Sequence, residues 1–269
     1  MKKVICANAR IAAGGLSRYK KMNALSQDSK MQAKARKKLQ PDELKRILDD
    51  HRRWLQSNGT LGCRADLHFC DLSNRDMFGA DLTAAILRDI DFSHTNLRTS
   101  NLTQADLSGC RFHKTHMQWS ILNGARLHKC SLTQANLQFC DFSNADLSDS
   151  DCSGSFFHNA YLGGAVLQRI SLVAANLRFS TWSSSDLSHI NLSASTIQLA
   201  DFSYTSLHEI KFHKSQIFNT DFTGSDLSAV DFSDTRMENV DFQGTDLNPK
   251  NLQGVQLLNC TFDRPAGVR

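Results

Sequence analysis

Every fifth residue from Leu67 to Phe262 is a large apolar residue, and this register runs without one insertion or deletion. It comprises forty consecutive positions, (262 − 67)/5 + 1, and the only smaller occupant is Cys152. A second register lies two residues before the first and holds only Ala, Ser, Thr, Cys, Val or Ile, except at Arg75 and Lys250. We call the first the large register and the second the small register, and the two together the inner registers. Neither an α-helix nor a β-strand keeps residues five apart on one face over such a length. The sequence therefore predicts a coil with short straight sides and a corner after every fifth residue.

The commonest order within the five residues is Ala, Asp or Asn, Leu or Phe, and two variable residues, as in Ala65-Asp66-Leu67. This pattern resembles the A-(D/N)-L-x-x signature of pentapeptide-repeat proteins. The resemblance implies an all-β solenoid, a right-handed quadrilateral β-helix with four repeats in each coil. The leader from Glu43 to Gly62 also resembles the segment that precedes the repeats in some bacterial members of the family.

The large residues can be sorted by a period of twenty, and they then form four columns of different composition. The column that begins at Leu67 is Leu at all ten levels. Phe is concentrated in the columns that begin at Leu72 and Leu82, whereas the column that begins at Met77 has Phe157 as its only Phe. We number these columns as the first, second, third and fourth sides in the chain order Leu67, Leu72, Met77, Leu82. Such sorting is expected of four stacked sides and predicts about ten coils, or a rod of roughly 48 Å at the spacing of β-strands.

The sequence divides into four segments. They are a basic, flexible or partly helical arm at 1–40, an amphipathic capping helix at 41–60, the repeats at 61–264 and a short tail at 265–269. The helix is predicted from Pro41 at its first turn, from the apolar stripe that follows, and from Asn58-Gly59 as a stop. A cap is expected because the core of an open first coil would face water.

Charge separates the arm from the body. Residues 1–62 contain fifteen Lys/Arg and five Asp/Glu, a net charge of +10, whereas residues 63–269 contain sixteen and twenty-two, a net charge of −6. A basic run in the arm is a candidate contact for nucleic acid or anionic lipid, because clustered positive charge attracts both. A solvated tail would explain the same run. The run consists of Lys34, Arg36, Lys37 and Lys38.

Six of the eight cysteines fall in the two inner registers, where we expect them to behave as small buried hydrophobes. This use of cysteine favours a reducing compartment, so the expected localisation is cytoplasmic. We also expect no signal peptide and no membrane span, because no apolar run approaches about 20 residues.

The sequence predicts neither an enzyme nor a cofactor or metal site. Asp precedes the large residue sixteen times, and this regularity indicates that Asp stabilises turns rather than acting as a catalytic carboxylate. The spacing Cys110-x-x-His113-x-x-His116 resembles a metal motif, but Cys110 is expected inside the coil and the two histidines outside it. Zinc needs convergent ligands, which this arrangement does not provide.

The outside of the third side departs from the repeat pattern. Two residues after its large positions, successive levels hold Trp119, Phe139, Asn159, Phe179 and Leu199. Beside this row lie His116, Phe156, His158 and Arg178, with Tyr161 around the next corner. An exposed apolar patch of this kind often marks an interaction site, although an aromatic stack can also serve only to stabilise a coil.

We therefore expect a non-enzymatic scaffold that binds an unidentified protein partner through the third side. The family resemblance implies an alternative, since some pentapeptide-repeat proteins mimic DNA and bind gyrase or another topoisomerase. The weak charge of the body and the basic arm argue against this alternative. Leu257 and Phe262 end the stack beneath a short tail, so we expect either that this tail folds over them or that two molecules meet there as an end-to-end homodimer through the C-terminal coil.

Overall fold

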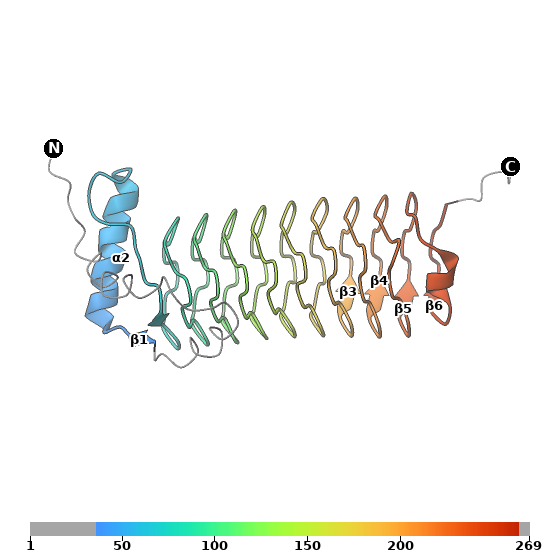
Figure 1. The fold of residues 1–269 in the computed structure, drawn as a ribbon, viewed down its shortest axis with the longest axis horizontal. Coiled ribbons are helices and arrows are strands. Elements are labelled where there is room, and N and C mark those ends of the chain that lie inside the picture. The colour runs from blue at the N-terminus through green and yellow to red at the C-terminus, as the bar shows by residue number, and fades with distance from the viewer. Residues whose placement is uncertain (1–35, 264–269) are drawn as a thin grey trace, which may run out of the picture.

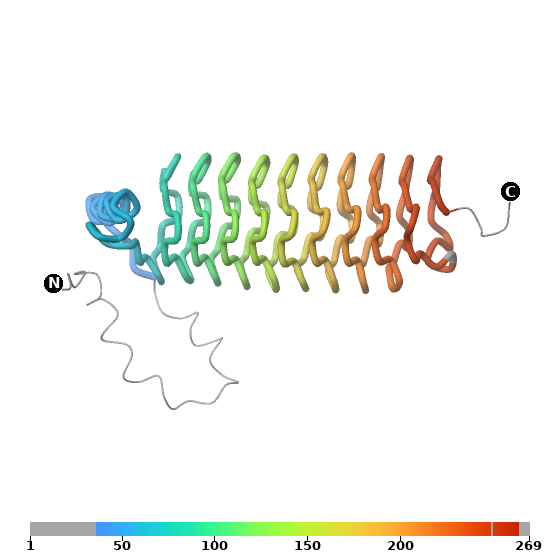
Figure 2. The backbone as a smooth tube through the Cα atoms, turned by 90° about the horizontal axis from the view of Figure 1, so that it is seen from above, coloured from blue at the N-terminus to red at the C-terminus, as the bar shows by residue number. Residues whose placement is uncertain are grey.

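The structure is a computed structural model that describes residues 36–263. These residues form a rod of stacked coils, with helix α2 (Pro41–Gln56) across one end and the C-terminal coil at the other (Figure 1). When the rod is turned by 90°, the corners of successive coils form straight rows along its length (Figure 2). The five-residue repeat therefore folds into an elongated stack of coils whose sides are long and regular.

Successive coils are joined by parallel backbone pairing at a spacing of twenty residues. The isolated bridges pair residue n with residue n + 20, from Asp66 with Ile86 to Asp241 with Thr261. At the first of these bridges, the Leu67 N–H donates to the Ile86 carbonyl and the Ile86 N–H donates to the Ala65 carbonyl, both at 2.9 Å. The period of twenty that sorts the columns in the sequence is therefore the length of one coil.

Regular strands are short and occur at two places. At the N-terminal end, β1 (Lys37–Lys38) pairs in parallel with β2 (Cys70–Asp71). Near the C-terminal end, four strands of the third side form one parallel sheet: β3 (Thr196–Gln198), β4 (Gln216–Phe218), β5 (Arg236–Glu238) and β6 (Gln256–Leu258). A 3₁₀ helix, η3 (Pro249–Leu252), replaces the regular side just before β6 and contains Lys250, one of the two exceptions in the small register.

A left-handed residue forms most corners. At the first corner, the Cys70 N–H donates to the Leu67 carbonyl at 3.2 Å, and Phe69 between them has a φ of 58°. A positive φ at the third residue of such a turn is the mark of a type II turn. Glycine suits one of these corners especially well, because a Cβ on Gly224 would lie 2.8 Å from the ring of Tyr204.

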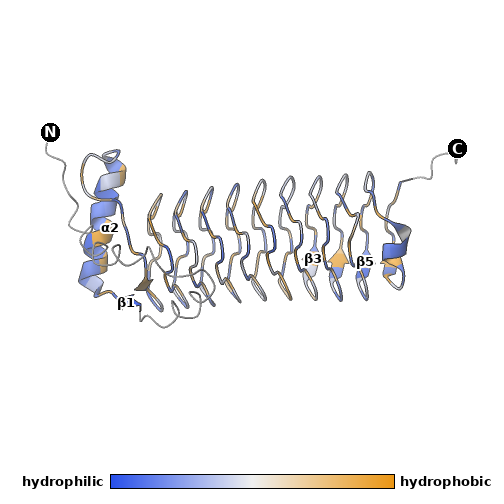
Figure 3. Ribbon diagram, in the orientation of Figure 1, coloured by the Kyte–Doolittle hydropathy of each residue, from blue (hydrophilic) through white to orange (hydrophobic). Residues whose placement is uncertain are grey.

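The large register forms one continuous core. All of its side chains from Leu67 to Phe242 are buried. Rings of one column stack on each other between coils, with centroids 5.6 Å apart for Trp182 and Phe202 and 5.4 Å for Phe202 and Phe222. Colouring by hydropathy shows apolar residues recurring in every coil (Figure 3). Because the columns differ in side-chain size, each side of the rod has its own packing.

The small register tolerates polar residues because their side chains bond to the neighbouring coil. The Thr95 hydroxyl donates to the Leu72 carbonyl at 2.7 Å, and the Cys110 thiol donates to the Leu87 carbonyl at 2.8 Å. The cysteines of the two inner registers are free thiols, and burial raises the pKa of the Cys140 thiol to about 12. These cysteines therefore behave as small core residues, as their positions in the repeat indicate.

The N-terminal boundary of the folded body differs from the expected arm, which ends at residue 40. β1 extends the first coil, since the Lys37 N–H donates to the Phe69 carbonyl at 3.0 Å, and Leu39 is 2% exposed. Arg75, the other exception in the small register, donates to the Leu39 carbonyl. A single buried leucine has no periodicity, which is why the sequence pattern did not include this segment in the body.

The basic run is partly used within the fold. Arg36 Nε donates to the Asp89 carbonyl at 2.8 Å, and Lys37 Nζ lies 2.6 Å from a carboxylate oxygen of Glu43. Lys38 is exposed, and Lys34 lies outside the described residues. Arg36 and Lys37 therefore have partners in the body, so a contact of this run with nucleic acid or lipid would have to compete with them.

The C-terminal end of the core is open among the described residues. Leu257, Leu258 and Phe262 are 40%, 52% and 41% exposed. Phe262 still stacks on Phe242 at 5.3 Å, so the last coil continues the aromatic column. The expected end-to-end homodimer through this coil stays a prediction.

His51 joins α2 to the first coil. Its side chain is fully buried, its Nδ1 accepts a hydrogen bond from the Ala65 N–H at 3.1 Å, and its ring stacks on Trp54 at 5.7 Å. Burial lowers the pKa of His51 below the ordinary value of 6.5, because a charged imidazole would lose its hydration there. This hydrogen bond between the helix and the coil is therefore made by a neutral histidine.

We expect this histidine to make the free energy of unfolding depend on pH. Its contribution is fully present above about pH 6.5 and is lost as the pH falls toward the lowered pKa of the folded protein, because the unfolded chain then binds a proton that the folded chain does not. The loss is up to about 1.4 kcal/mol for each pH unit. Urea denaturation at about pH 7.5 and pH 5.5 measures the change in the free energy of unfolding. The same measurement on His51→Leu gives the contribution of the other histidines, which is subtracted. An equal change in wild type and variant would contradict the assignment.

Candidate interaction surface

Four aromatic rings form a continuous chain on the outside of the third side. Trp119 and Phe139 stack in parallel, with centroids 4.0 Å apart and planes inclined by 2°. His158 meets Phe139 edge-on at 5.8 Å and Phe179 edge-on at 5.0 Å. We call Trp119, Phe139, His158 and Phe179 the aromatic ladder. The row expected from the period of twenty is therefore a physically connected surface that runs along the rod.

The backbone does not favour aromatic residues at these positions. Trp119, Phe139 and Phe179 have φ values of 65°, 59° and 58°, in the left-handed region. This conformation costs an ordinary L-residue about 1–2 kcal/mol and suits Gly or Asn better. Asn159, the residue on the level between Phe139 and Phe179, follows that preference. The rings are therefore present despite the local conformation and not because of it.

The other residues expected at this surface extend it on both edges. Phe156 and Tyr161 are 43% and 58% exposed, and neither has an aromatic partner among the described residues. Leu199 continues the row beyond Phe179 and is 48% exposed. His116 and Arg178 are exposed on the same side. The ladder is thus the connected centre of a broader apolar surface that also contains two polar residues, His116 and Arg178.

Two further aromatic residues of the third side were not found by sequence reasoning. Phe78 lies toward the N-terminal end and has the guanidinium of Arg98 5.8 Å from its ring centroid. Phe218 lies toward the C-terminal end and has the guanidinium of Arg236 at 5.5 Å. Both rings occupy the first position after the large residue, and sorting that column by twenty would have revealed them. An arginine covers each outer ring, whereas the ladder between them has no such cover among the described residues.

Gln118, next to Trp119, has a buried amide oxygen with no hydrogen-bond partner in the described part of the chain. An unpaired buried acceptor is costly, and such groups are rare in folded proteins. The coil that begins the ladder therefore contains an uncompensated polar group beside its largest exposed ring.

The third and fourth sides differ in charge. The outward acidic residues of the third side are Asp76 and Glu238, and its outward arginines are Arg98, Arg178 and Arg236. The fourth side has no Lys or Arg between residues 36 and 263, and its acidic residues are Asp81, Asp141, Asp201, Asp221, Asp241 and Asp263. The aromatic ladder therefore lies on a weakly basic side, next to a strongly acidic one.

The recurring Asp residues stabilise turns. An oxygen of Asp141 accepts hydrogen bonds from the Ser143 N–H at 2.9 Å and from the Ser143 hydroxyl at 2.6 Å. Equivalent bonds from the side chain and backbone of Ser233 lower the pKa of Asp231. These contacts recur on every side of the coil, which supports a structural role rather than a catalytic one.

The residues of the apparent metal motif do not converge. The buried Cys110 thiol bonds to a backbone carbonyl, His113 Nδ1 lies 2.8 Å from the Thr133 hydroxyl on the second side, and His116 lies on the third side. Within residues 36–263, no group of three or more His, Cys, Asp or Glu side chains could hold a metal ion. No helix in this part of the chain is both long and apolar enough to cross a membrane.

A coil of twenty residues with four sides and parallel pairing between coils defines a class of protein, the right-handed quadrilateral β-helix. The family model for pentapeptide repeats matches the sequence in eight copies, at residues 76–113, 110–149, 140–178 and 215–248. The chain belongs to the pentapeptide-repeat family.

One solved structure, that of HetL, supports the fold. HetL, a pentapeptide-repeat protein involved in heterocyst differentiation regulation from the cyanobacterium Nostoc sp. strain PCC 7120, is 22% identical with a TM-score of 0.71. That match covers 86% of this chain and 99% of HetL. QnrB1, a plasmid-mediated fluoroquinolone resistance protein, is 16% identical with a TM-score of 0.33, over 72% of this chain and 93% of QnrB1. Among curated protein sequences, no significant match is found.

The ladder and the core should differ in their effects on stability. Phe139→Ala removes two ring contacts on the surface, with Trp119 and with His158, and should lower the free energy of unfolding by about 1–2 kcal/mol. Phe222→Ala removes a fully buried ring and should lower it by about 3–5 kcal/mol. Urea denaturation of both variants and the wild type measures the two values. A loss for Phe139→Ala as large as that for Phe222→Ala would show that the ladder is mainly a stabilising stack.

Proposed function

We propose that this protein is a non-enzymatic binding module of the cytoplasm, a rod of about ten coils closed at its N-terminal end by α2, that presents the aromatic ladder to a protein partner. The ladder is the observation that supports this proposal most. Its four rings touch in sequence, Trp119 is 59% exposed, and three of the rings occupy left-handed positions that favour other residues. Aromatic residues of this kind are typical of the centres of protein interfaces.

The geometry of the ladder indicates the kind of partner. Coils are spaced by about 4.8 Å, so the three steps from Trp119 to Phe179 extend about 14 Å along the rod. A peptide segment that lies along the rod could place apolar side chains against successive rings. Arg178 is exposed and has no ion-pair partner among the described residues, so an acidic residue at one end of that segment would match it. We therefore propose an apolar segment with an acidic end as the partner.

The proposal is tested with a triple variant, Trp119→Ser, Phe139→Ser and Phe179→Ser, and a matched control, Tyr204→Ser. Tyr204 is 71% exposed but lies on the fourth side, away from the ladder. The tagged full-length chain is used to capture partners from a native lysate, and the affinity of a purified partner is then measured by titration. We expect the triple variant to bind at least about a hundredfold more weakly than wild type, and the control to bind as wild type does. A partner that binds wild type and triple variant equally, with both folded, would contradict the proposal.

The alternative function, binding of gyrase or another topoisomerase as a DNA mimic, is supported by the fourth side. Asp201, Asp221 and Asp241 occupy the same position on successive coils there. Regularly spaced carboxylates could meet a cationic surface that normally binds DNA. A gyrase supercoiling assay separates the two functions: inhibition at micromolar protein that is lost when these three residues are changed to Asn would favour the alternative. Unchanged supercoiling in the presence of the wild type would contradict it.

A further inference from the structure

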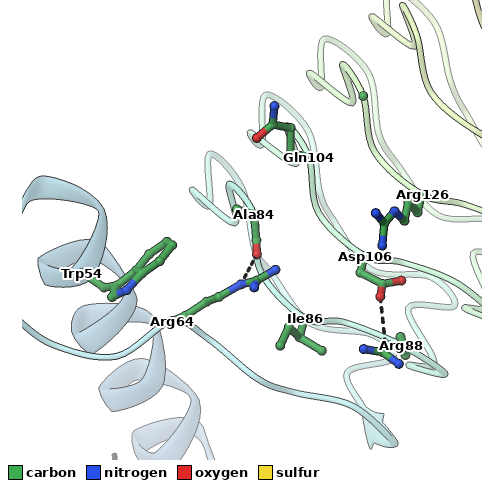
Figure 4. Close-up of a pocket in the computed structure, with 9 residues that line it drawn as sticks. Trp54, Arg64, Ala84, Ile86, Arg88, Gln104, Asp106 and Arg126 are labelled. Atoms are coloured by element: carbon green, nitrogen blue, oxygen red, sulfur yellow. Dashed lines mark hydrogen bonds and ion pairs between the residues drawn. The ribbon is translucent and has the colours of Figure 1, made fainter. Parts of the chain in front are cut away.

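A cavity of about 550 Å³ lies where α2 and the chain after it meet the corner between the fourth and first sides (Figure 4). Trp54 comes from α2 and Arg64 from the following segment. Positions on successive coils form the rest of its wall, among them Arg88, Asp106 and Arg126. This volume falls within the range of small-molecule sites. We call the cavity the arginine pocket.

The pocket is positively charged. It contains three guanidinium groups and one carboxylate, a net charge of 3 − 1 = +2. Arg88 Nε lies 2.8 Å from an Asp106 oxygen, so this pair is internally neutral. Arg64 donates its Nε to the Ala84 carbonyl, which leaves its two terminal nitrogens available. Arg126 has no ion pair or side-chain hydrogen bond within the described residues. Two guanidinium groups can therefore donate to a ligand.

The charge of the pocket is unusual for the surface in which it lies. The fourth side has no Lys or Arg between residues 36 and 263, and the column of the first side that contains Arg126 holds six Asp and no other basic residue. Arg88 likewise is the only Lys or Arg in its own column of the first side. Asp or Asn at the position of Arg126 forms the turns of the repeat, so the fold itself does not require arginine there.

An aromatic wall completes the pocket. One face of the Trp54 indole stacks on the buried His51 ring, with planes inclined by 13°. A Cβ on Gly59 would lie 3.2 Å from the indole nitrogen, so the edge of the ring is also closely packed. Figure 4 shows the indole projecting from the helix toward Arg64 and Ala84. The ring is held in place by its neighbours and borders the cavity.

We infer that the arginine pocket binds the phosphate group of a small molecule that also has a planar ring, of the class of a nucleoside monophosphate. Guanidinium groups bind phosphate oxygens through paired, charge-assisted hydrogen bonds. Arg64 and Arg126 hold the phosphate, Trp54 stacks against the ring, and Asp106 keeps Arg88 in place beside them. This site lies on other sides of the rod than the aromatic ladder and is independent of the proposed function.

Isothermal titration of the full-length chain with AMP, adenosine and inorganic phosphate tests the site. AMP should bind saturably and more tightly than either adenosine or phosphate, because each of these lacks one of the two recognised groups. Arg126→Ala should weaken AMP binding at least about tenfold. Trp54→Leu should weaken AMP binding but leave the weak binding of inorganic phosphate unchanged.

The matched control is Arg111→Ala. Arg111 is also an exposed arginine, it lies on the second side outside the pocket, and its closest ion-pair distance, to Asp91, is 3.9 Å. Thermal unfolding of each variant verifies that the rod is intact. The inference is overturned by any of three results: no saturable AMP binding up to about 5 mM, adenosine binding as tightly as AMP, or the same AMP affinity in Arg126→Ala and Arg111→Ala.

Discussion

The structure depends on backbone hydrogen bonds that join each residue to the coil twenty residues further on. Because both N–H and C=O groups of a side are used by the coils above and below, coils of equal length keep this pairing in register along the rod. An inserted residue that is not bulged out at a corner would shift the side chains that follow it to other positions of the coil. The uninterrupted register from Leu67 to Phe262 therefore keeps the pairing between coils regular along the whole rod.

This constraint divides the residues of each repeat by role. The large residue fills the interior, the small residue leaves room for it and often bonds to the preceding coil, and the Asp or Asn bonds to the turn. The two remaining positions face solvent, and the fold restricts only the backbone conformation of the second. Information about function is therefore concentrated in these two outward positions and in the exceptions to the Asp/Asn column.

The sequence predicted the architecture well because the architecture is periodic. The core, the four sides and the row from Trp119 to Leu199 all follow from the period of five and its multiple of twenty. Contacts that involve residues outside the repeat, or that depend on the conformation of a side chain, could not be predicted in this way. Leu39 packs on the first coil although it does not belong to the register. Arg98 lies over the ring of Phe78, a contact that depends on side-chain conformation and cannot be read from the sequence. The arginine pocket also required the structure, since Trp54 and Arg126 line one pocket only where α2 packs on the first coil, a contact to which His51 contributes.

The aromatic ladder and the arginine pocket share one property: both contain residues that depart from the usual residue types of the repeat at their positions. Aromatic residues occupy left-handed positions on the third side, where Asn or Gly would be easier to accommodate. Arginine occupies an outward column of the first side that is otherwise rich in Asp. A fold with strict rules makes such departures informative, because the usual structural explanation for a residue is already known at each position. The two surfaces also lie on different sides of a continuously hydrogen-bonded rod, so a ligand in one need not displace a partner on the other.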